Sequence, residues 1–312
     1  MPDKPPLTPD VFSINTAELA DALKQFIRES MENLRRDGIV CAVSGGLDSS
    51  TAAALCSGAV GRDKVTALLL PERQGSPAAL DYGRQIAEHL GIRHETIDIS
   101  PVLSRLGTYN FITSYIPFRK FREFLITGFL KSSKKNIFLD SLKGDQSRLF
   151  KKGFSVMNTK HRVRLVVTCL YAESRNLMVA GSAHKSEDMV GLFTKFGVDD
   201  NADIMPMKNL YRSHILQLAE HLGIPDEIIG RTPNPEIIPG VEDKYRDVLA
   251  LESGTADLVL YGFEHGYSQE EISRQTGIPL SKVEEIRDLI AVTEHMRNKS
   301  MAPDVSGLID EL

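Results

Sequence analysis

The stretch from residue 39 to residue 55 constrains the fold of this chain more than any other part. An apolar segment at 39–43 runs into the turn Ser-Gly-Gly-Leu-Asp at 44–48, and an alanine-rich helix is expected from Ser49 to Leu55. A buried strand that passes through a glycine turn into a helix makes an anion site, because the first N–H groups of that helix are unpaired. Glycines at 45 and 46 let the backbone approach a phosphate closely. Asp48 would repel a bare phosphate, so it predicts a bound cation, Mg²⁺.

Alternating strands and helices around this stretch predict an α/β fold. A helix is expected at 17–34, and after the glycine turn come a strand at 65–70, a helix at 76–90 and a strand at 94–99. This order implies parallel strands joined by right-handed crossovers, and therefore a doubly wound, mostly parallel sheet of the Rossmann-like type. Ligands of such sheets bind at the carboxyl ends of the strands, where the glycine turn lies.

The alternation stops between residues 101 and 156, in a stretch that is basic and aromatic. We interpret 101–156 as a helical insertion with a solvated face, and the alternative is a lid or a docking surface for a polyanionic ligand. Further on, we expect a helix at 160–174, a strand at 177–180 and helices near 187–193 and 211–221. Residues 256–312 are predicted to form a helical C-terminal tail. The whole chain, 1–312, is expected to be a single domain.

Composition excludes several classes of protein. The net charge of −5 gives no general attraction to nucleic acid or to an anionic membrane, and no run is long and apolar enough to cross a bilayer. The first nine residues are polar and rich in proline, which does not fit a secretory signal. Cys41, Cys56 and Cys169 lie in apolar surroundings without metal-type spacing. They are interpreted as the buried thiols of a cytoplasmic protein.

The turn Ser-Gly-Gly-x-Asp-Ser at 44–49 resembles the pyrophosphate loop of the ATP pyrophosphatases, and no Gly-Lys-Ser/Thr closes it as in a Walker loop. Those enzymes bind ATP, adenylylate a substrate and release pyrophosphate. Three further stretches narrow the resemblance: Asn-Thr-Lys-His-Arg-Val-Arg at 158–164, the long Gly-Ser-Ala-His-Lys-Ser-Glu-Asp segment continuing through 181–197, and Ala-Asp-Ile-Met-Pro at 202–206. With the loop, their order and spacing are similar to those of ammonia-dependent NAD synthetase, from about residue 15 to residue 300 outside the insertion.

That family converts nicotinic acid adenine dinucleotide to NAD. ATP activates the nicotinate carboxylate as an acyl-adenylate, pyrophosphate leaves, and ammonia attacks the acyl carbon. The resemblance implies that Asp48 and Glu187 hold Mg²⁺ and that these two residues and Lys195 are catalytic. It assigns ATP binding to Ser44, Gly45, Gly46, Leu47, Asp48, Ser49, Ser50, Thr51, Ser182, Arg212 and Asn234. It assigns substrate binding to Arg162, Lys195, Asp203, His295 and Met296. Each of the charged residues, taken alone, would more often be an ordinary surface charge.

The chain departs from the family pattern mainly on the acceptor side. Met296 stands where the family has a lysine, residues 245–252 lack a recognisable Asp-Glu pair, and the loop at 198–201 is one residue longer. The changes at ATP positions are milder, since Ser182 and Asn234 replace threonines and Arg212 replaces a lysine. A related amide- or thioamide-forming ligase that acts on another carboxylate is therefore an alternative. A pseudoenzyme is a further one, against which the presence of Asp48 and Glu187 argues.

Partners follow from the same resemblance. It implies a homodimer with the substrate at the subunit interface. No glutaminase module is recognisable, so free ammonia or a separate glutaminase would supply the nitrogen. Residues 266–283 have a pattern similar to a helix-turn-helix, which would indicate a DNA-binding regulator. However, the would-be second helix continues Glu-Glu-Ile-Arg-Asp, which is too acidic for the major groove, so no nucleic-acid partner is expected.

Overall fold

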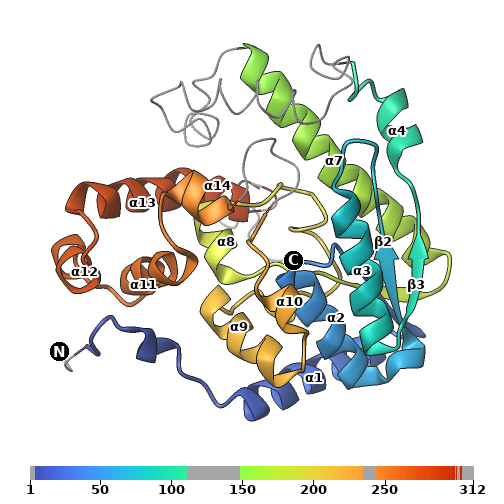
Figure 1. The fold of residues 1–312 in the computed structure, drawn as a ribbon, viewed down its shortest axis with the longest axis horizontal. Coiled ribbons are helices and arrows are strands. Elements are labelled where there is room, and N and C mark those ends of the chain that lie inside the picture. Colours follow the sequence, from blue (N-terminus) through green and yellow to red (C-terminus); the bar gives the residue numbers. More distant parts are fainter. Residues whose placement is uncertain (1–3, 111–147, 235–242, 299, 301–302, 304–312) are drawn as a thin grey trace, which may run out of the picture.

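A parallel four-stranded sheet lies at the centre of the fold, as a computed structural model shows (Figure 1). The structure describes residues 4–110, 148–234, 243–298, 300 and 303. Neighbouring strands follow the order β3-β2-β1-β4, and every pairing is parallel. Val40 of β1 pairs with Thr66 on one side and Val179 on the other. The predicted α/β fold is therefore confirmed. The strands are β1 (Gly38–Ala42), β2 (Val65–Leu69), β3 (Arg93–Thr96) and β4 (Leu177–Ala180).

Helices cover both faces of the sheet. Successive side chains of a strand point to opposite faces, and here the side chains on both faces are apolar, so each face needs a layer of helices. Ile39 and Cys41 pack with one layer of helices, whereas Val40 packs with the other. The first layer consists of α1 (Thr16–Asn33), α2 (Leu47–Val60), α3 (Pro77–Leu90), α9 (Arg212–His221) and α10 (Asp226–Ile229). The second consists of α4 (Ser100–Arg105) and α7 (Arg148–Glu173). With helices on both faces, the central strands are buried and read as continuous apolar runs.

The C-terminal helices build a separate apolar cluster beside the sheet, at the left of Figure 1. The pattern that is similar to a helix-turn-helix folds into α12 (Gln269–Thr276) and α13 (Leu280–Val292), whose Ile272 and Val283 are buried in this cluster. The cluster also contains residues of η1 (Pro9–Phe12), α8 (Lys185–Val190), η4 (Tyr245–Leu249) and α11 (Ser253–Glu264). Helix α14 (Glu294–Arg297) follows α13, and the short η2 (Arg62–Lys64) precedes β2. Among the described residues, no helix combines the length and the apolar character needed to span a membrane.

Several boundaries differ from the prediction. Helix α2 spans Leu47–Val60 where 49–55 was expected, and α8 spans Lys185–Val190 where 187–193 was expected. Helix α7 begins at Arg148, well before residue 160, so residues 148–156 continue the helix that packs on the sheet. Thr159 lies within the helix, where its hydroxyl donates to the carbonyl of Ser155 one turn back. Strand β3 ends at Thr96, before the predicted residue 99, because Asp98 accepts the N–H of Ser100 at the start of α4. The remaining part of the predicted insertion, 111–147, lies outside the described residues.

Candidate active site

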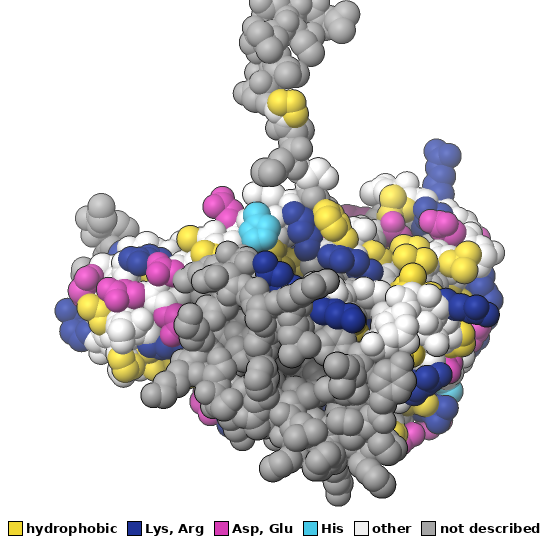
Figure 2. Space-filling model, turned by 90° about the horizontal axis from the view of Figure 1, so that it is seen from above, with side chains coloured by type: hydrophobic (Ala, Val, Ile, Leu, Met, Phe, Trp, Pro, Cys, Tyr) yellow, Lys and Arg dark blue, Asp and Glu magenta, His cyan; other side chains and the backbone are white. Residues whose placement is uncertain are grey.

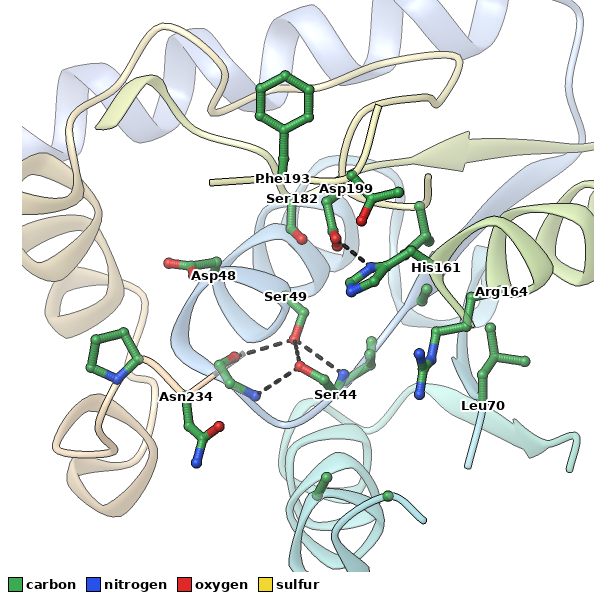
Figure 3. A pocket seen from close by; sticks show the side chains of 18 of the residues that line it. Ser44, Asp48, Ser49, Leu70, His161, Arg164, Ser182, Phe193, Asp199 and Asn234 are labelled. Atoms are coloured by element: carbon green, nitrogen blue, oxygen red, sulfur yellow. Dashed lines mark hydrogen bonds and ion pairs between the residues drawn. The ribbon is translucent and has the colours of Figure 1, made fainter. Parts of the chain in front are cut away.

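A cavity of about 520 Å³ opens at the carboxyl ends of β1 and β4. The chain leaves β1 for β2 and β3 on one side, while β4 lies on the other, so this point is the topological switch of the sheet. Its walls include the loop before α2, the segment after β4, the start of α9 and one side of α7 (Figure 3). Its volume lies in the range of small-molecule sites. We therefore regard it as the active site.

The glycine turn is closed by its own side chains. Ser49 Oγ accepts the N–H of Ser44 at 3.2 Å, and Ser44 Oγ accepts the N–H of Gly46 at 3.3 Å. Gly45 has φ +71°, and a Cβ on it would lie 2.4 Å from Cβ of Tyr82 in α3. Arg231 also donates to the Gly45 carbonyl at 2.6 Å. The turn is thus pressed between α3 and Arg231, with the first N–H groups of α2 beside the cavity.

Replacing Gly45 with alanine is expected to weaken nucleotide binding at least about ten-fold and to cost about 1–3 kcal/mol of stability. The added methyl group collides with α3, and the positive φ disfavours any residue with a Cβ. Titration calorimetry with an ATP analogue and thermal unfolding measure the two effects. Gly223→Ala is the control, since Gly223 has φ +72° but open space around it. If both variants lose nucleotide equally, the close packing of the turn is not the cause.

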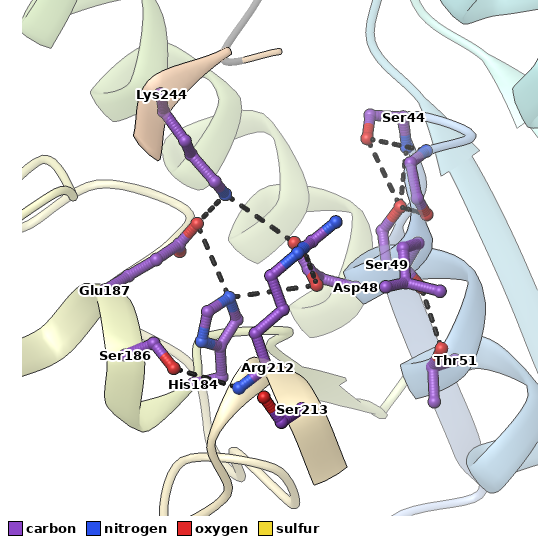
Figure 4. Close-up of polar contacts among 12 residues, drawn as sticks. Ser44, Asp48, Ser49, Thr51, His184, Ser186, Glu187, Arg212, Ser213 and Lys244 are labelled. Carbon is purple, nitrogen blue, oxygen red and sulfur yellow. Dashed lines mark hydrogen bonds and ion pairs between the residues drawn. The ribbon is translucent and has the colours of Figure 1, made fainter. Parts of the chain in front are cut away.

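Two carboxylates and two cations meet beside the glycine turn, at its last residue, Asp48 (Figure 4). Arg212 at the start of α9 lies 3.0 Å from Asp48 Oδ1. Lys244 Nζ is 3.7 Å from Asp48 Oδ2 and pairs with Glu187 Oε1. His184 Nε2 is 3.8 Å from Asp48 and 3.5 Å from Glu187. The loop after β4 and helix α8 thus bring the predicted partners Asp48 and Glu187 to the same place.

Burial and charge set the ionisation of this cluster. Burial alone would raise the pKa of Asp48, but Arg212, followed by His184 and Lys244, outweighs it and lowers that pKa to about 2. Burial is the main cause that lowers the pKa of His184 to about 4. At neutral pH Asp48 is therefore an anion, and the imidazole of His184 is uncharged with a free lone pair.

The donor set fits a divalent cation. Ligand atoms of Asp48, His184 and Glu187 all lie within 4.8 Å of one another. The His184 side chain is fully buried, and neither of its ring nitrogens has a hydrogen-bond partner among the described residues. A buried imidazole without a partner, aimed at two carboxylates, is a typical metal ligand. Carboxylate oxygens are the donors that Mg²⁺ prefers, and an imidazole adds tolerance for Mn²⁺.

The predicted ATP residues fall into two groups. Ser50 and Thr51 are buried inside α2, where the Thr51 hydroxyl donates to the Leu47 carbonyl at 2.8 Å. They support the turn from behind and do not border the cavity. The remaining members, except Gly45, line it: Ser44, Gly46, Leu47, Asp48, Ser49, Ser182, Arg212 and Asn234.

The predicted substrate residues do not line the cavity. Arg162 donates to the Lys195 carbonyl at 3.1 Å, and Lys195 Nζ donates to the His295 carbonyl at 2.6 Å, so these three residues form one chain of contacts. Asp203 lies apart and accepts the backbone N–H of Val179 in β4 at 2.8 Å. Met296 is only 9% exposed and packs against Gly191 and Thr293. Its side chain is an apolar packing element between α8 and the C-terminal helices.

Comparisons with known proteins identify the family of this chain. The model of the family described as NAD synthase matches residues 19–115 and 120–300. The chain belongs to the NAD synthase family. An "NH(3)-dependent NAD(+) synthetase" from Methanocaldococcus jannaschii is 33% identical over 288 residues, which cover 92% of this chain and 97% of that protein. A protein of the same name from Coprothermobacter proteolyticus is 31% identical, with 92% and 98% covered.

Solved structures support the fold alone, because their sequence identity is low. "NMN synthetase from Francisella tularensis" has a TM-score of 0.69 at 24% identity and covers 94% of this chain and 100% of its own. An "NH3-dependent NAD synthetase from Campylobacter jejuni" has a TM-score of 0.64 at 21% identity, with 93% and 99% covered.

Several residues of the candidate site in this NAD synthase were missed by the sequence analysis. His184 lies within the long motif at 181–197, and its position three residues before Glu187 on a helix start is a usable signal. His161 and Asp199 form an ion pair at 2.5 Å that also lines the cavity (Figure 3). Arg231 and Lys244 lie outside the four stretches on which the family resemblance was based. Only the folded chain shows that they reach the cavity.

Proposed function

We propose that this protein makes NAD from nicotinic acid adenine dinucleotide in an ATP-dependent amidation. The carboxylate would be activated as an acyl-adenylate, with release of pyrophosphate, and ammonia would displace AMP. The observation that carries the proposal is the meeting of Asp48 and Glu187 beside the glycine turn, at the switch point of a parallel sheet. Relatives that are named ammonia-dependent NAD synthetases support the same reaction, because this chain aligns with almost their whole length.

The ATP half of the cavity suits transfer of AMP. A carboxylate is a poor electrophile until one of its oxygens becomes a leaving group, and moving AMP onto it requires neutralisation of the triphosphate. The N–H groups of the turn and the guanidinium of Arg212 would face the phosphates. Asp48 and Glu187, with His184 beside them, would hold Mg²⁺, which supplies charge neutralisation at the phosphate oxygens. The low pKa of Asp48 keeps it ionised for this role across the neutral range.

On the acceptor side, we propose that Arg162, Lys195 and His295 hold the dinucleotide, because contacts through backbone carbonyls already join them and Arg162 and Lys195 carry positive charges. Figure 2 shows Lys and Arg side chains across the middle of one face, between the C-terminal helices and α4. Asp203 and Met296 now carry backbone and packing contacts, and their substrate roles stay predictions. A different acceptor carboxylate is the second candidate, favoured by the methionine at 296.

Product analysis tests the proposal. The protein is incubated with ATP, Mg²⁺, ammonia and nicotinic acid adenine dinucleotide, and phosphorus NMR follows the products. We expect AMP and pyrophosphate together with NAD. Turnover of another carboxylate, but not of this one, would overturn the acceptor and leave the ATP chemistry standing. Release of ADP and phosphate would contradict both. Glutamine in place of ammonia is expected to give no product unless a separate glutaminase is added.

We also propose that the protein works as a homodimer in the cytoplasm. Apolar side chains of α4 and α7 stand exposed, with Val166 at 65% and Leu170 at 68%, and Val102 and Leu106 face outward on the neighbouring helix. Figure 2 shows exposed hydrophobic side chains in the half of the molecule that carries α4. A patch of this kind is typical of a subunit contact. All three cysteines are free thiols, as in most cytoplasmic proteins.

Leu170→Glu is expected to weaken the dimer at least about ten-fold, because a carboxylate would be buried in an apolar contact without a partner. Light scattering coupled to size-exclusion chromatography over a concentration series measures the shift to monomer. Leu34→Glu is the matched control, since Leu34 is exposed at the end of α1, away from this patch. A Leu170→Glu variant that stays dimeric at low concentration would place the interface elsewhere.

A further inference from the structure

Lys244 occupies the space between the two proposed metal ligands. Its ammonium pairs with Glu187 Oε1 and lies 3.7 Å from Asp48 Oδ2 (Figure 4). Only 14% of the Lys244 side chain is exposed, against 21% for Asp48 and 11% for Glu187. The backbone holds the residue there as well, because the N–H of Lys244 donates to the carbonyl of Pro233 at 3.0 Å. This lysine therefore belongs to the cavity wall and not to the solvent-exposed surface.

The charges in this cluster already balance without a metal ion. The carboxylates of Asp48 and Glu187 face the cations of Arg212 and Lys244, which makes two charges of each sign. A divalent ion added between the carboxylates would leave an excess of two positive charges in a mostly buried site, a costly state. The Lys244 ammonium and the metal ion would also bind the same carboxylate oxygens. Metal and Lys244 must therefore compete for this position.

A nucleotide changes that balance. A triphosphate at the glycine turn brings several negative charges into the same cavity, so an ammonium displaced from Asp48 and Glu187 finds a new partner nearby. The side chain can make such a move because lysine carries a point charge on a flexible four-carbon stem. Arg212 has less freedom, since its backbone N–H donates to Ser186 Oγ and its guanidinium is held by Asp48.

We propose that Lys244 is an internal counter-ion of the metal site, which neutralises Asp48 and Glu187 before nucleotide binds and yields to the metal when the triphosphate arrives. The inference rests on the metal role proposed above for these two carboxylates. Its consequence is that the metal ion enters with ATP and not ahead of it. Lys244 then passes from the carboxylates to the phosphates, whose negative charge also offsets the excess positive charge that the metal ion would otherwise create.

Metal binding without turnover tests this inference. Mn²⁺ is titrated into the nucleotide-free protein and followed by electron paramagnetic resonance, for the wild type and for Lys244→Met. The methionine keeps the length of the side chain and removes its charge. We expect Lys244→Met to bind Mn²⁺ at least about ten-fold more tightly. With α,β-methylene-ATP present, the advantage should shrink to less than about three-fold, because Lys244 has by then left the carboxylates.

Three further variants make the result specific. Lys208→Met removes the same charge from a lysine that pairs with Asp188 at 3.0 Å, beside the site but outside the cavity, and should leave Mn²⁺ binding unchanged. Lys244→Arg keeps the charge and should keep binding weak. Asp48→Asn in the Lys244→Met background should remove the tightened binding. Equal Mn²⁺ affinity in wild type and Lys244→Met overturns the inference, as does an equal gain in Lys208→Met. Because no catalysis is measured, failure of the proposed reaction would show separately.

Discussion

Replacing Asp48 with asparagine is expected to lower the rate of pyrophosphate release at least about 10³-fold, because a lost metal ligand costs several kcal/mol of transition-state stabilisation. The side chain keeps its size, so Arg212 still has an oxygen to contact and the fold should survive. The substitution removes the negative charge of Asp48. Because the pKa of Asp48 is about 2, that charge is present at every pH at which the enzyme would work. A coupled pyrophosphate assay and a thermal unfolding curve give the two quantities.

Asp188→Asn is the matched control for this loss. Asp188 follows Glu187 on the same short helix and pairs with Lys208, but it does not line the cavity. Its replacement should change turnover by less than about three-fold, as for most surface substitutions. An Asp48→Asn enzyme with normal turnover would remove Asp48 from the mechanism, and an equal loss in both variants would indicate a general effect of charge.

The parts of the site that the sequence predicted are those built from neighbouring residues. Strand β1, the glycine turn and the start of α2 follow one another within a few residues, and their roles are set by local backbone geometry. A Cβ at Gly45 would meet α3, which explains why the turn needs glycine there. Asp48 was predicted for the same reason, because its place at the first turn of α2 is fixed by the chain itself.

The parts that the sequence did not predict depend on packing between distant segments. The substrate role of Met296 stays a prediction from its place in a motif, but the position of its sulfur beside Gly191 depends on how α14 packs on the chain. Asp203 accepts the backbone N–H of Val179 within β4, a contact that periodicity does not encode. Lys244 and Arg231 reach the cavity from outside the four stretches on which the family resemblance was based. Tertiary contacts determine the positions of such side chains, and rules based on neighbouring residues in the sequence do not predict those contacts.

Glu187→Gln provides the last prediction, because it asks whether both carboxylates hold one ion. Alone, it should lower turnover about as much as Asp48→Asn, at least about 10³-fold. The double variant should then lose no more than about three-fold beyond either single variant, since a metal that one substitution has already released cannot be released again. The comparison is made on kcat at saturating ATP and Mg²⁺.

The geometry favours this strong coupling over simple additivity. Asp48 and Glu187 contact the same ammonium of Lys244 and lie near the same ring nitrogen of His184, so they face one shared position and not two. If the two losses multiplied in the double variant, each carboxylate would have to act on a different partner, such as a metal ion for one and Lys244 for the other. Residues that act as a unit show a saturating loss, whereas independent residues add. The cycle therefore distinguishes a single shared cation from two separate contacts, and it does so in the one reaction that the site is proposed to perform.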